Sequence, residues 1–330
     1  MPRFSLKFAA HFCIWMTACP MACLVLPADA QIYPNKPVKL VVGFAPAGAA
    51  DYVARALSEP LSRALGQPVI VENRAGAGSS IAAEYVAKSA PDGYTLLIAS
   101  PSSISVNPAV NPKLGYSARD LAPVIKVSSS PLVIVANKEL GVNSIRELIA
   151  AAKKSPGKLN YASSGNGSAP HLSGVLFTRL AGVEMVHVPF KGGGPAVQSV
   201  IAGDTQITFG TPPSVLPLMQ AGRLKGLAVS SRARSPLVPD LPGMVEAGLP
   251  DYDMSFWYGF FVPAGTPPAV IRRIFDAAAQ VVQLPDVRQA FAREGTETAS
   301  SKSPEEFAAY VAEDAKFWVR LVKDARITVD

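Results

Sequence analysis

Small residues gather in five short turns, and each turn directly follows a predicted strand. Such turns offer backbone N–H groups and hydroxyls but few charges, and N–H groups at the start of a helix favour an anion. The turns are Ala45–Ala50, Ser100–Ser103, Ser163–Ser168, Lys191–Pro195 and Gly210–Ser214. One such turn is ordinary, whereas five in one chain predict a cleft that holds an anion rather than transforms it.

Four titratable residues lie in or near these turns, and three of them allow two interpretations. Asp51 follows the first turn and either stabilises a helix start or pairs with a ligand amine or hydroxyl. Lys191 is either a counter-charge for a carboxylate or a solvated lysine. His171 either pins its loop, which we favour, or donates to a ligand, and His187 fits a packed or edge position of a strand. Two separated histidines do not predict a metal site.

Catalytic signatures are largely absent. The sequence contains no G-x-S-x-G elbow, no H-E-x-x-H, no Walker sequence and no G-x-G-x-x-G after a strand. Ser168 and His171 are close in sequence, but nothing completes a triad with them. We therefore expect no catalytic residue, cofactor or metal. A periplasmic hydrolase or transferase that uses Ser168 or Ser102 near His171 stays open as an alternative, because a fold alone does not fix a function.

Short β-rich runs alternate with helical patterns along the chain, which predicts an α/β fold with parallel sheets covered on both faces. The predicted strands are 38–42, 69–72, 95–99, 132–136, 159–162, 185–189, 205–209, 226–230 and 255–262. The predicted helices are 52–65, 79–88, 144–153, 170–180, 195–201, 214–220, 268–282, 285–293 and 304–323. A capping box is predicted at Ser144 and Glu147, and residues 235–253 are predicted to be a long surface connection.

The order of these elements predicts two α/β domains joined by two strand crossovers. We place the first domain at 31–128 plus 256–330 and the second at 129–255. The aromatic residues Trp257, Tyr258 and Phe260 near the return crossover are interpreted as core or hinge packing, with a ligand wall as the alternative. Two crossovers make a hinge, so a ligand belongs in the cleft at the carboxyl ends of the strands.

The first thirty residues have the pattern of a secretory signal peptide. Arg3 and Lys7 precede an apolar run, and Ala28-Asp29-Ala30 predicts cleavage before Gln31. All three cysteines lie in this segment, so the mature chain has none. These features predict a periplasmic protein that is held together by its core alone.

The net charge also limits the partners that we expect. The full chain carries +6, and the signal peptide contributes two positive charges and one negative, which leaves about +5. The basic residues are scattered and are not interleaved with aromatics, so nucleic acid binding is not expected. A modest positive field can steer an anionic ligand.

Six blocks in order resemble the tripartite tricarboxylate transporter receptor family, which includes the periplasmic Bug receptors. The resemblance covers nearly all of residues 31–330. The blocks read YPNKPVKLVVGF from Tyr33, LGQPVIVENRAGAGSSIAAEYVAKSAPDGYTLL from Leu65, LNYASSGNGSAPHLSG from Leu159, HVPFKGGGPAV from His187, AGRLKGLAVSS from Ala221 and EAGLPDYDMSFWYGFFVPAGTP from Glu246. The resemblance implies a two-lobed receptor, of the type II-like Venus flytrap fold, that hands a small carboxylate to a membrane permease.

The same resemblance implies a set of ligand-binding residues on the strand-end loops. Ser102 adds a hydroxyl from the second turn. The full set is Phe44, Ala47, Gly48, Ala49, Asp51, Ser102, Ser163, Ser164, Asn166, Ser168, His171, Gly192, Gly193, Gly210 and Thr211. A monomer is expected, and docking of the loaded receptor on a membrane sensor kinase is an alternative role that can coexist with transport.

The chain departs from the family pattern at two places that concern the ligand. The family's first loop commonly carries two adjacent glycines and a hydroxyl residue before the Asp, where this chain has Ala47-Gly48 and Ala50. The family's turn after the strand that ends at Phe209 often begins with Asp, where this chain has Gly210. Loss of that carboxylate predicts a ligand without an essential ammonium group.

Overall fold

The computed structural model describes residues 33–111 and 113–324. The predicted signal peptide and its cleavage before Gln31 lie outside these residues. In the described part of the chain, no helix is both long enough and apolar enough to cross a membrane.

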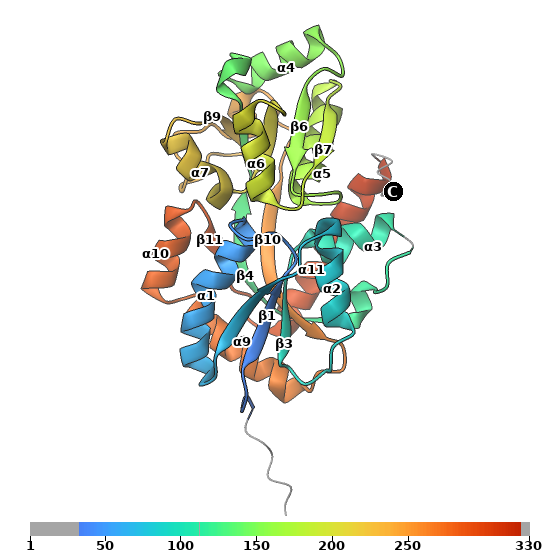
Figure 1. Ribbon diagram of the computed structural model, residues 1–330, viewed down its shortest axis with the longest axis vertical. Helices are drawn as coiled ribbons and strands as arrows, with labels where there is room; N and C mark the ends of the chain where they lie inside the picture. Colours follow the sequence, from blue (N-terminus) through green and yellow to red (C-terminus); the bar gives the residue numbers. More distant parts are fainter. Residues whose placement is uncertain (1–32, 112, 325–330) are drawn as a thin grey trace, which may run out of the picture. The chain divides into compact units, whose positions relative to one another are not determined.

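Two β-sheets organise the fold (Figure 1). The six-stranded sheet has the order β11-β4-β10-β3-β1-β2. Its strands are β1 (Val38–Val42), β2 (Val69–Asn73), β3 (Thr95–Ala99), β4 (Leu121–Pro131), β10 (Ser255–Pro263) and β11 (Glu297–Thr298). The five-stranded sheet has the order β7-β6-β8-β5-β9. Its strands are β5 (Val133–Ala136), β6 (Asn160–Ser163), β7 (Val186–Pro189), β8 (Ile207–Gly210) and β9 (Lys225–Val229).

Helices pack on both sheets and complete two lobes. The first lobe consists of the six-stranded sheet with α1 (Ala49–Leu65), α2 (Ser80–Ala87), α3 (Asn107–Val110), α9 (Pro268–Val281), α10 (Pro285–Arg293) and α11 (Pro304–Asp324). The second lobe consists of the five-stranded sheet with α4 (Ile145–Lys154), α5 (Ala169–Ala181), α6 (Gly193–Ala202), α7 (Pro212–Gln220) and α8 (Met244–Ala247).

All of the predicted strands and helices exist, with ends within three residues of their predicted positions. Each of the last three helices begins at a proline, where the missing N–H costs nothing. The capping box at α4 is only half formed. The Ser144 hydroxyl accepts from the Glu147 N–H (3.2 Å), but the Glu147 carboxylate accepts from the Asn143 N–H (2.8 Å) instead of that of Ser144.

The predicted parallel pairing is present in part, because each sheet combines parallel and antiparallel strands. In the first sheet β1 is parallel to β2 and β3, whereas β10 is antiparallel to both β3 and β4. In the second sheet β6 is parallel to β7 and β8, whereas β5 is antiparallel to β8 and β9. The cause is the connection between the lobes. β5 enters the second sheet and β10 re-enters the first, each from the end where the parallel strands finish, so each runs against them.

The buried Ser230 forms hydrogen bonds with both chain segments that connect the two lobes. Leu132, between β4 and β5, donates its N–H to the Ser230 hydroxyl (2.7 Å), and that hydroxyl donates to the Met254 carbonyl just before β10 (2.6 Å). The Ser230 backbone also bonds to the backbone of both residues. The two crossing segments are therefore fixed to each other at Ser230.

Replacement of Ser230 by alanine is expected to lower the free energy of unfolding by about 1.5 kcal/mol, because it leaves the buried Leu132 N–H without an acceptor. Urea unfolding of the ligand-free protein measures this change. Ser231→Ala is the matched control, because the neighbouring Ser231 hydroxyl makes only an exposed bond to Ala233. Equal stability of the two variants would contradict a role of Ser230 in joining the segments.

Candidate functional site

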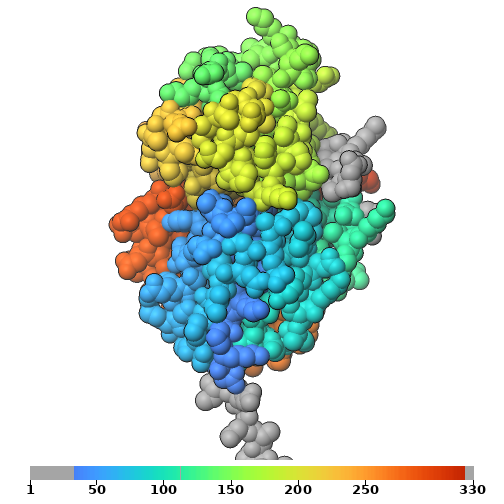
Figure 2. All heavy atoms as spheres, viewed as in Figure 1, coloured from blue at the N-terminus to red at the C-terminus, as the bar shows by residue number. Residues whose placement is uncertain are grey.

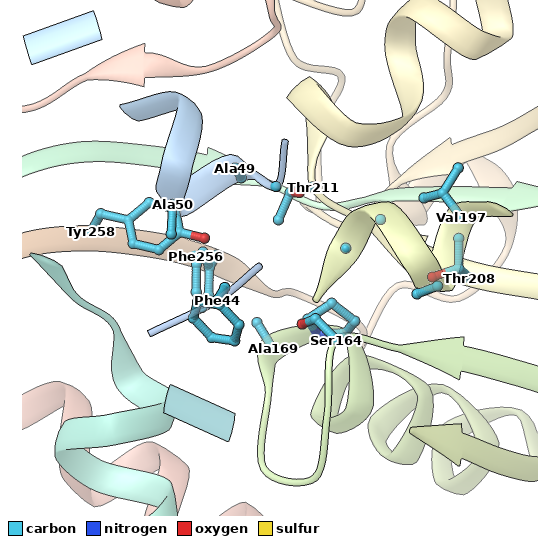
Figure 3. Close-up of a pocket in the computed structure, with 15 residues that line it drawn as sticks. Phe44, Ala49, Ala50, Ser164, Ala169, Val197, Thr208, Thr211, Phe256 and Tyr258 are labelled. Atoms are coloured by element: carbon cyan, nitrogen blue, oxygen red, sulfur yellow. The ribbon is translucent and has the colours of Figure 1, made fainter. Parts of the chain in front are cut away.

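A small cavity lies where the strand-end loops of both lobes meet. Its volume is about 20 Å³, which is room for about one water molecule. The loops after β1, β6 and β8 contribute to it, as do the first turns of α1, α5 and α6 and two side chains of β10 (Figure 3). The lining residues are Phe44, Gly48, Ala49, Ala50, Ser164, Ala169, Pro170, Gly193, Ala196, Val197, Thr208, Gly210, Thr211, Phe256 and Tyr258. We call this space the first cavity.

Two helices present uncapped N-termini with free N–H groups to the first cavity. The described residues offer no side-chain cap to α1 or α6, whose N-cap residues are Gly48 and Gly192. α7 offers no such donors, because it begins with Pro212 and Pro213, which have no N–H, and its Ser214 N–H donates to the Thr211 carbonyl (2.9 Å). The N–H groups of a helix's first turn have no acceptor within the helix, and the helix dipole adds partial positive charge there. The first cavity therefore favours an anion.

Aromatic side chains form one wall of the first cavity. Figure 3 shows Phe44, Phe256 and Tyr258 together, with Val197 and Thr208 on the opposite side. The rings of Phe256 and Tyr258 meet edge to face with centroids 4.9 Å apart. This wall gives the cavity an apolar side beside its N–H groups.

Of the three aromatics singled out in the sequence, only Tyr258 lines the first cavity, and Phe256 was missed. Side chains alternate between the two faces of a strand, so Phe256 and Tyr258 share a face of β10. Trp257 is on the other face and packs against Phe261 and Phe307. The period of two in β10 could have identified Phe256.

A second cavity of about 250 Å³ adjoins the first and shares Phe44 and Ser164 with it. It is lined by Gly43, Phe44, Gly76, Ala77, Gly78, Ser79, Ser164, Gly165, Asn166, Pro189, Phe190 and Lys191. Lys191 is the one charged residue among the described residues that line either cavity. The segment 76–79 was missed as a site loop, although it is a sixth small polar turn after a strand.

The two lobes touch at the mouth of these cavities. The Ala45 N–H donates to the Lys191 carbonyl (3.3 Å). A Cβ added at Gly192 would lie 3.0 Å from that of Ala45, and one added at Gly78 would lie 2.2 Å from the Asn166 carbonyl oxygen. In Figure 2 the blue residues of the first lobe and the yellow-green residues of the second meet along the visible face without a gap. These contacts describe a closed cleft.

About half of the predicted site residues line the cavities. Those that do are Phe44, Gly48, Ala49, Ser164, Asn166, Gly193, Gly210 and Thr211. Those that do not are Ala47, Asp51, Ser102, Ser163, Ser168, His171 and Gly192. Ser102 lies in a buried π-helical turn, Ser102–Val106, and its hydroxyl has no partner among the described residues.

Asp51 binds its own loop. One carboxylate oxygen accepts from the Ala47 N–H (3.1 Å) and from Arg55 Nε (2.9 Å), and the other accepts from Asn73 Nδ2 (2.9 Å). Burial alone would raise the pKa of Asp51, but these bonds outweigh burial and hold its pKa below the usual value. Ala47 has a left-handed backbone (φ 63°), which the bond to Asp51 helps to hold.

His171 also pins its own loop. Its Nδ1 accepts from the Gly167 N–H (3.0 Å), and its ring stacks on that of His187 with centroids 3.9 Å apart. Burial lowers the pKa of His171 to about 4. His187 in turn bonds to the Ser163 hydroxyl through Nε2 (2.6 Å). Burial, with a further contribution from His171, lowers the pKa of His187 to about 3, so both rings are neutral at pH 7.

The Ser168 hydroxyl does not meet the His171 ring as a nucleophile would. It accepts from the His171 backbone N–H (3.4 Å), which makes Ser168 the N-cap of α5. The ring nitrogen that faces the loop is already bonded to Gly167. Among the described residues, no three His, Cys, Asp or Glu side chains gather as they would around a metal ion. The arrangement suits the binding of an anion by neutral donors.

Comparison with known proteins identifies the family of this chain. The profile of the tripartite tricarboxylate transporter family receptor matches residues 53–327. This chain belongs to that family. The receptor is 36% identical to the protein BugT of Bordetella pertussis over 303 residues, which are 91% of this chain and 93% of BugT.

Two similar solved structures contain a carboxylate. The R. palustris protein Rpa4515 with adipate is 34% identical to the receptor, with a TM-score of 0.86 over 90% of this chain and 99% of that one. MatC of Rhodopseudomonas palustris with bound malate is 32% identical, with a TM-score of 0.84 over 88% and 100% of the two chains.

These findings confirm the resemblance seen in the sequence and the two-lobed α/β fold of periplasmic binding proteins. The receptor is a periplasmic solute-binding protein and not an enzyme. The hydrolase or transferase alternative is therefore set aside.

Proposed function

We propose that this receptor captures a small carboxylate in the cleft between its lobes and delivers it to a membrane permease of the tripartite tricarboxylate type. The observation that carries the proposal is the convergence of two uncapped helix N-termini, those of α1 and α6, on a cavity without a lining acid among the described residues. Adipate and malate in two relatives support the ligand class.

The ligand of this proposal has no essential ammonium group. Proteins commonly pair a ligand ammonium with a carboxylate, and none lines either cavity in the described part of the chain. Asp51 is nearby, but its oxygens accept bonds from Ala47, Arg55 and Asn73. An amino acid is therefore expected to bind more weakly than its deaminated analogue.

The domain boundaries and site residues belong to the same proposal. The domains are 31–128 plus 256–330 and 129–255, and the connections at Leu132 and Met254 support this division. The ligand is expected to contact the predicted site residues that line the two cavities. The receptor is expected to act as a monomer, and docking on a sensor kinase stays a prediction.

Thermal unfolding tests the proposed function. The mature protein is refolded to remove carried ligand and is heated with di- and tricarboxylates, aromatic acids and acidic amino acids. A ligand at about 100 times its dissociation constant adds about 2.7 kcal/mol, which raises Tm by roughly 5 to 10 °C for domains of this size. A shift confined to carboxylates without an amine is expected. The absence of any shift would contradict carboxylate binding. A shift only with amino acids would contradict the proposal that the ligand has no essential ammonium group.

A further inference from the structure

The loop after β6, residues 163–168, serves the site in two ways. Its Ser164 lines both cavities, and its Asn166 lines the second. The loop also meets the first lobe, because a Cβ added at Gly167 would lie 2.2 Å from Asn107 Oδ1. The shape of this loop therefore affects both the lining of the cavities and the closure of the cleft.

The backbone of this loop needs partners that fix its shape. Residues 164–168 belong to no helix or strand, and Gly165 and Gly167 have positive φ angles of 126° and 70°. Glycine has many accessible conformations, so holding one of them requires interactions from elsewhere. Two histidine side chains bond to this loop, and neither histidine lines a cavity.

The first of these side chains, His171 on α5, serves the loop only as a neutral ring. Its Nδ1 accepts from the Gly167 N–H (3.0 Å), and a ring nitrogen that accepts a hydrogen bond carries no proton. The proton of the neutral ring is therefore on Nε2. A proton on Nδ1 would face the Gly167 N–H and break this bond.

The second side chain, His187 on β7, completes a stacked pair. Its Nε2 bonds to the Ser163 hydroxyl (2.6 Å), which also accepts from the Gly165 N–H (3.1 Å). The two imidazole rings lie 3.9 Å apart between centroids, with an interplanar angle of 15°. Two positive charges at this distance would repel each other, and burial lowers the pKa of both rings.

The strands packed against α5 add no charge to the pair. Tyr161 of β6 faces it, with its ring centroid 5.0 Å from that of His187. Burial raises the pKa of Tyr161, so this side chain is also neutral at pH 7. β8, with the sequence ITFG, contains no titratable residue. The loop is thus anchored on a neutral column of rings.

We propose that His171 and His187 act as one positioning unit, a neutral stacked pair that fixes loop 163–168 in the shape that binds the ligand and meets the first lobe. The group that the loop requires is an acceptor at the position of His171 Nδ1, and His187 holds the ring that carries it. This assignment rests on the proposed function, because its effect is measured on carboxylate binding.

Two substitutions of His171 separate the acceptor from the ring. Asparagine and leucine have nearly the same size and both remove the stack, but only asparagine places an oxygen acceptor near the position of Nδ1. His171→Leu is expected to weaken carboxylate binding about 10-fold or more, because the loop must move to bring the Gly167 N–H to water, whereas His171→Asn is expected to stay within about 3-fold of the wild type.

Isothermal titration measures these affinities with the acid that raises Tm most among succinate, malate, adipate, citrate and benzoate. Rescue by asparagine supports the positioning role, since a loss of packing alone would affect both variants. Equal losses in the two variants would overturn it. Failure of all five acids to bind the wild type would overturn the proposed function and this assignment with it.

Nitrogen-15 NMR of the ligand-free wild type tests the pair without a ligand or a variant. The third histidine of the chain, His11, precedes the predicted cleavage before Gln31, so the mature protein gives the signals of this pair alone. His171 is expected to carry its proton on Nε2, and neither ring is expected to take up a second proton between about pH 8 and about pH 5, whereas an ordinary histidine is half protonated near about pH 6.5. Titration of either ring near pH 6.5 would overturn the neutral pair, even in a receptor that binds a carboxylate.

Discussion

Replacement of Gly78 by alanine is expected to lower the affinity for the carboxylate ligand by about 100-fold, because it keeps the cleft from closing. A Cβ at this position would lie 2.2 Å from the Asn166 carbonyl oxygen of the second lobe. That oxygen belongs to the backbone and cannot rotate away, so the lobes must separate. Apparent affinity falls in proportion to the fraction of molecules that can adopt the closed state.

Gly182→Ala separates this effect from backbone strain. Gly78 and Gly182 have nearly the same left-handed backbone, with φ of 57° and 60°. Nothing lies within 4 Å of a Cβ added at Gly182. Both variants are expected to lose about 1 kcal/mol of stability, but only Gly78→Ala is expected to lose affinity in isothermal titration. Wild-type affinity in Gly78→Ala would show that this contact does not govern closure.

Replacement of Asp51 by asparagine is expected to lower the free energy of unfolding by about 3 kcal/mol at pH 7. The carboxylate accepts from Ala47, Arg55 and Asn73, and an amide would turn an NH₂ group toward at least one of these donors. Urea unfolding of the ligand-free protein measures the loss. Glu59→Gln is the control, since the ion pair of Glu59 with Arg63 is largely exposed and contributes little.

The pH dependence of the Asp51 effect has a definite sign. The folded state holds the pKa of Asp51 below its ordinary value of 3.8, so the stabilisation is fully present above that value. It is lost as the pH falls through 3.8 toward the folded pKa. The stability gap between wild type and Asp51→Asn should therefore be constant from pH 7 to about pH 5 and narrow below pH 4. A gap that stays constant down to pH 3 would contradict ionised Asp51 as its cause.

The alternation of strands and helices could be predicted from the sequence, but β4 could not. Its sequence contains Pro123 and ends in Ser-Ser-Ser-Pro, which reads as a loop. It is a strand because nine of its residues pair with β10, more than a hundred residues further along the chain. Pairing over such a separation overrides local propensity.

The donor-rich loops could also be predicted, but not the residues that face the cavities. Each of the turns that precede α1, α5, α6 and α7 contributes to the first cavity, whereas Ser100–Ser103 leads into a buried π-helical turn. The side chains of Asp51 and His171 bond within their own loops, which follows from local geometry. Which loop meets which across the cleft depends on how the two lobes pack, and no single segment carries that information.

The uncapped starts of α1 and α6 have a consequence for how such a receptor evolves. An N–H group is present whatever side chain stands at its position, so a point mutation cannot delete the donor unless it introduces proline or unwinds the helix. In contrast, a point mutation can replace the side chains that form the rest of the site, such as the wall of Phe44, Phe256 and Tyr258, or Ser79. Single substitutions in these side chains can therefore change which ligand a related receptor binds, whereas the backbone N–H donors for one carboxylate are retained with the fold.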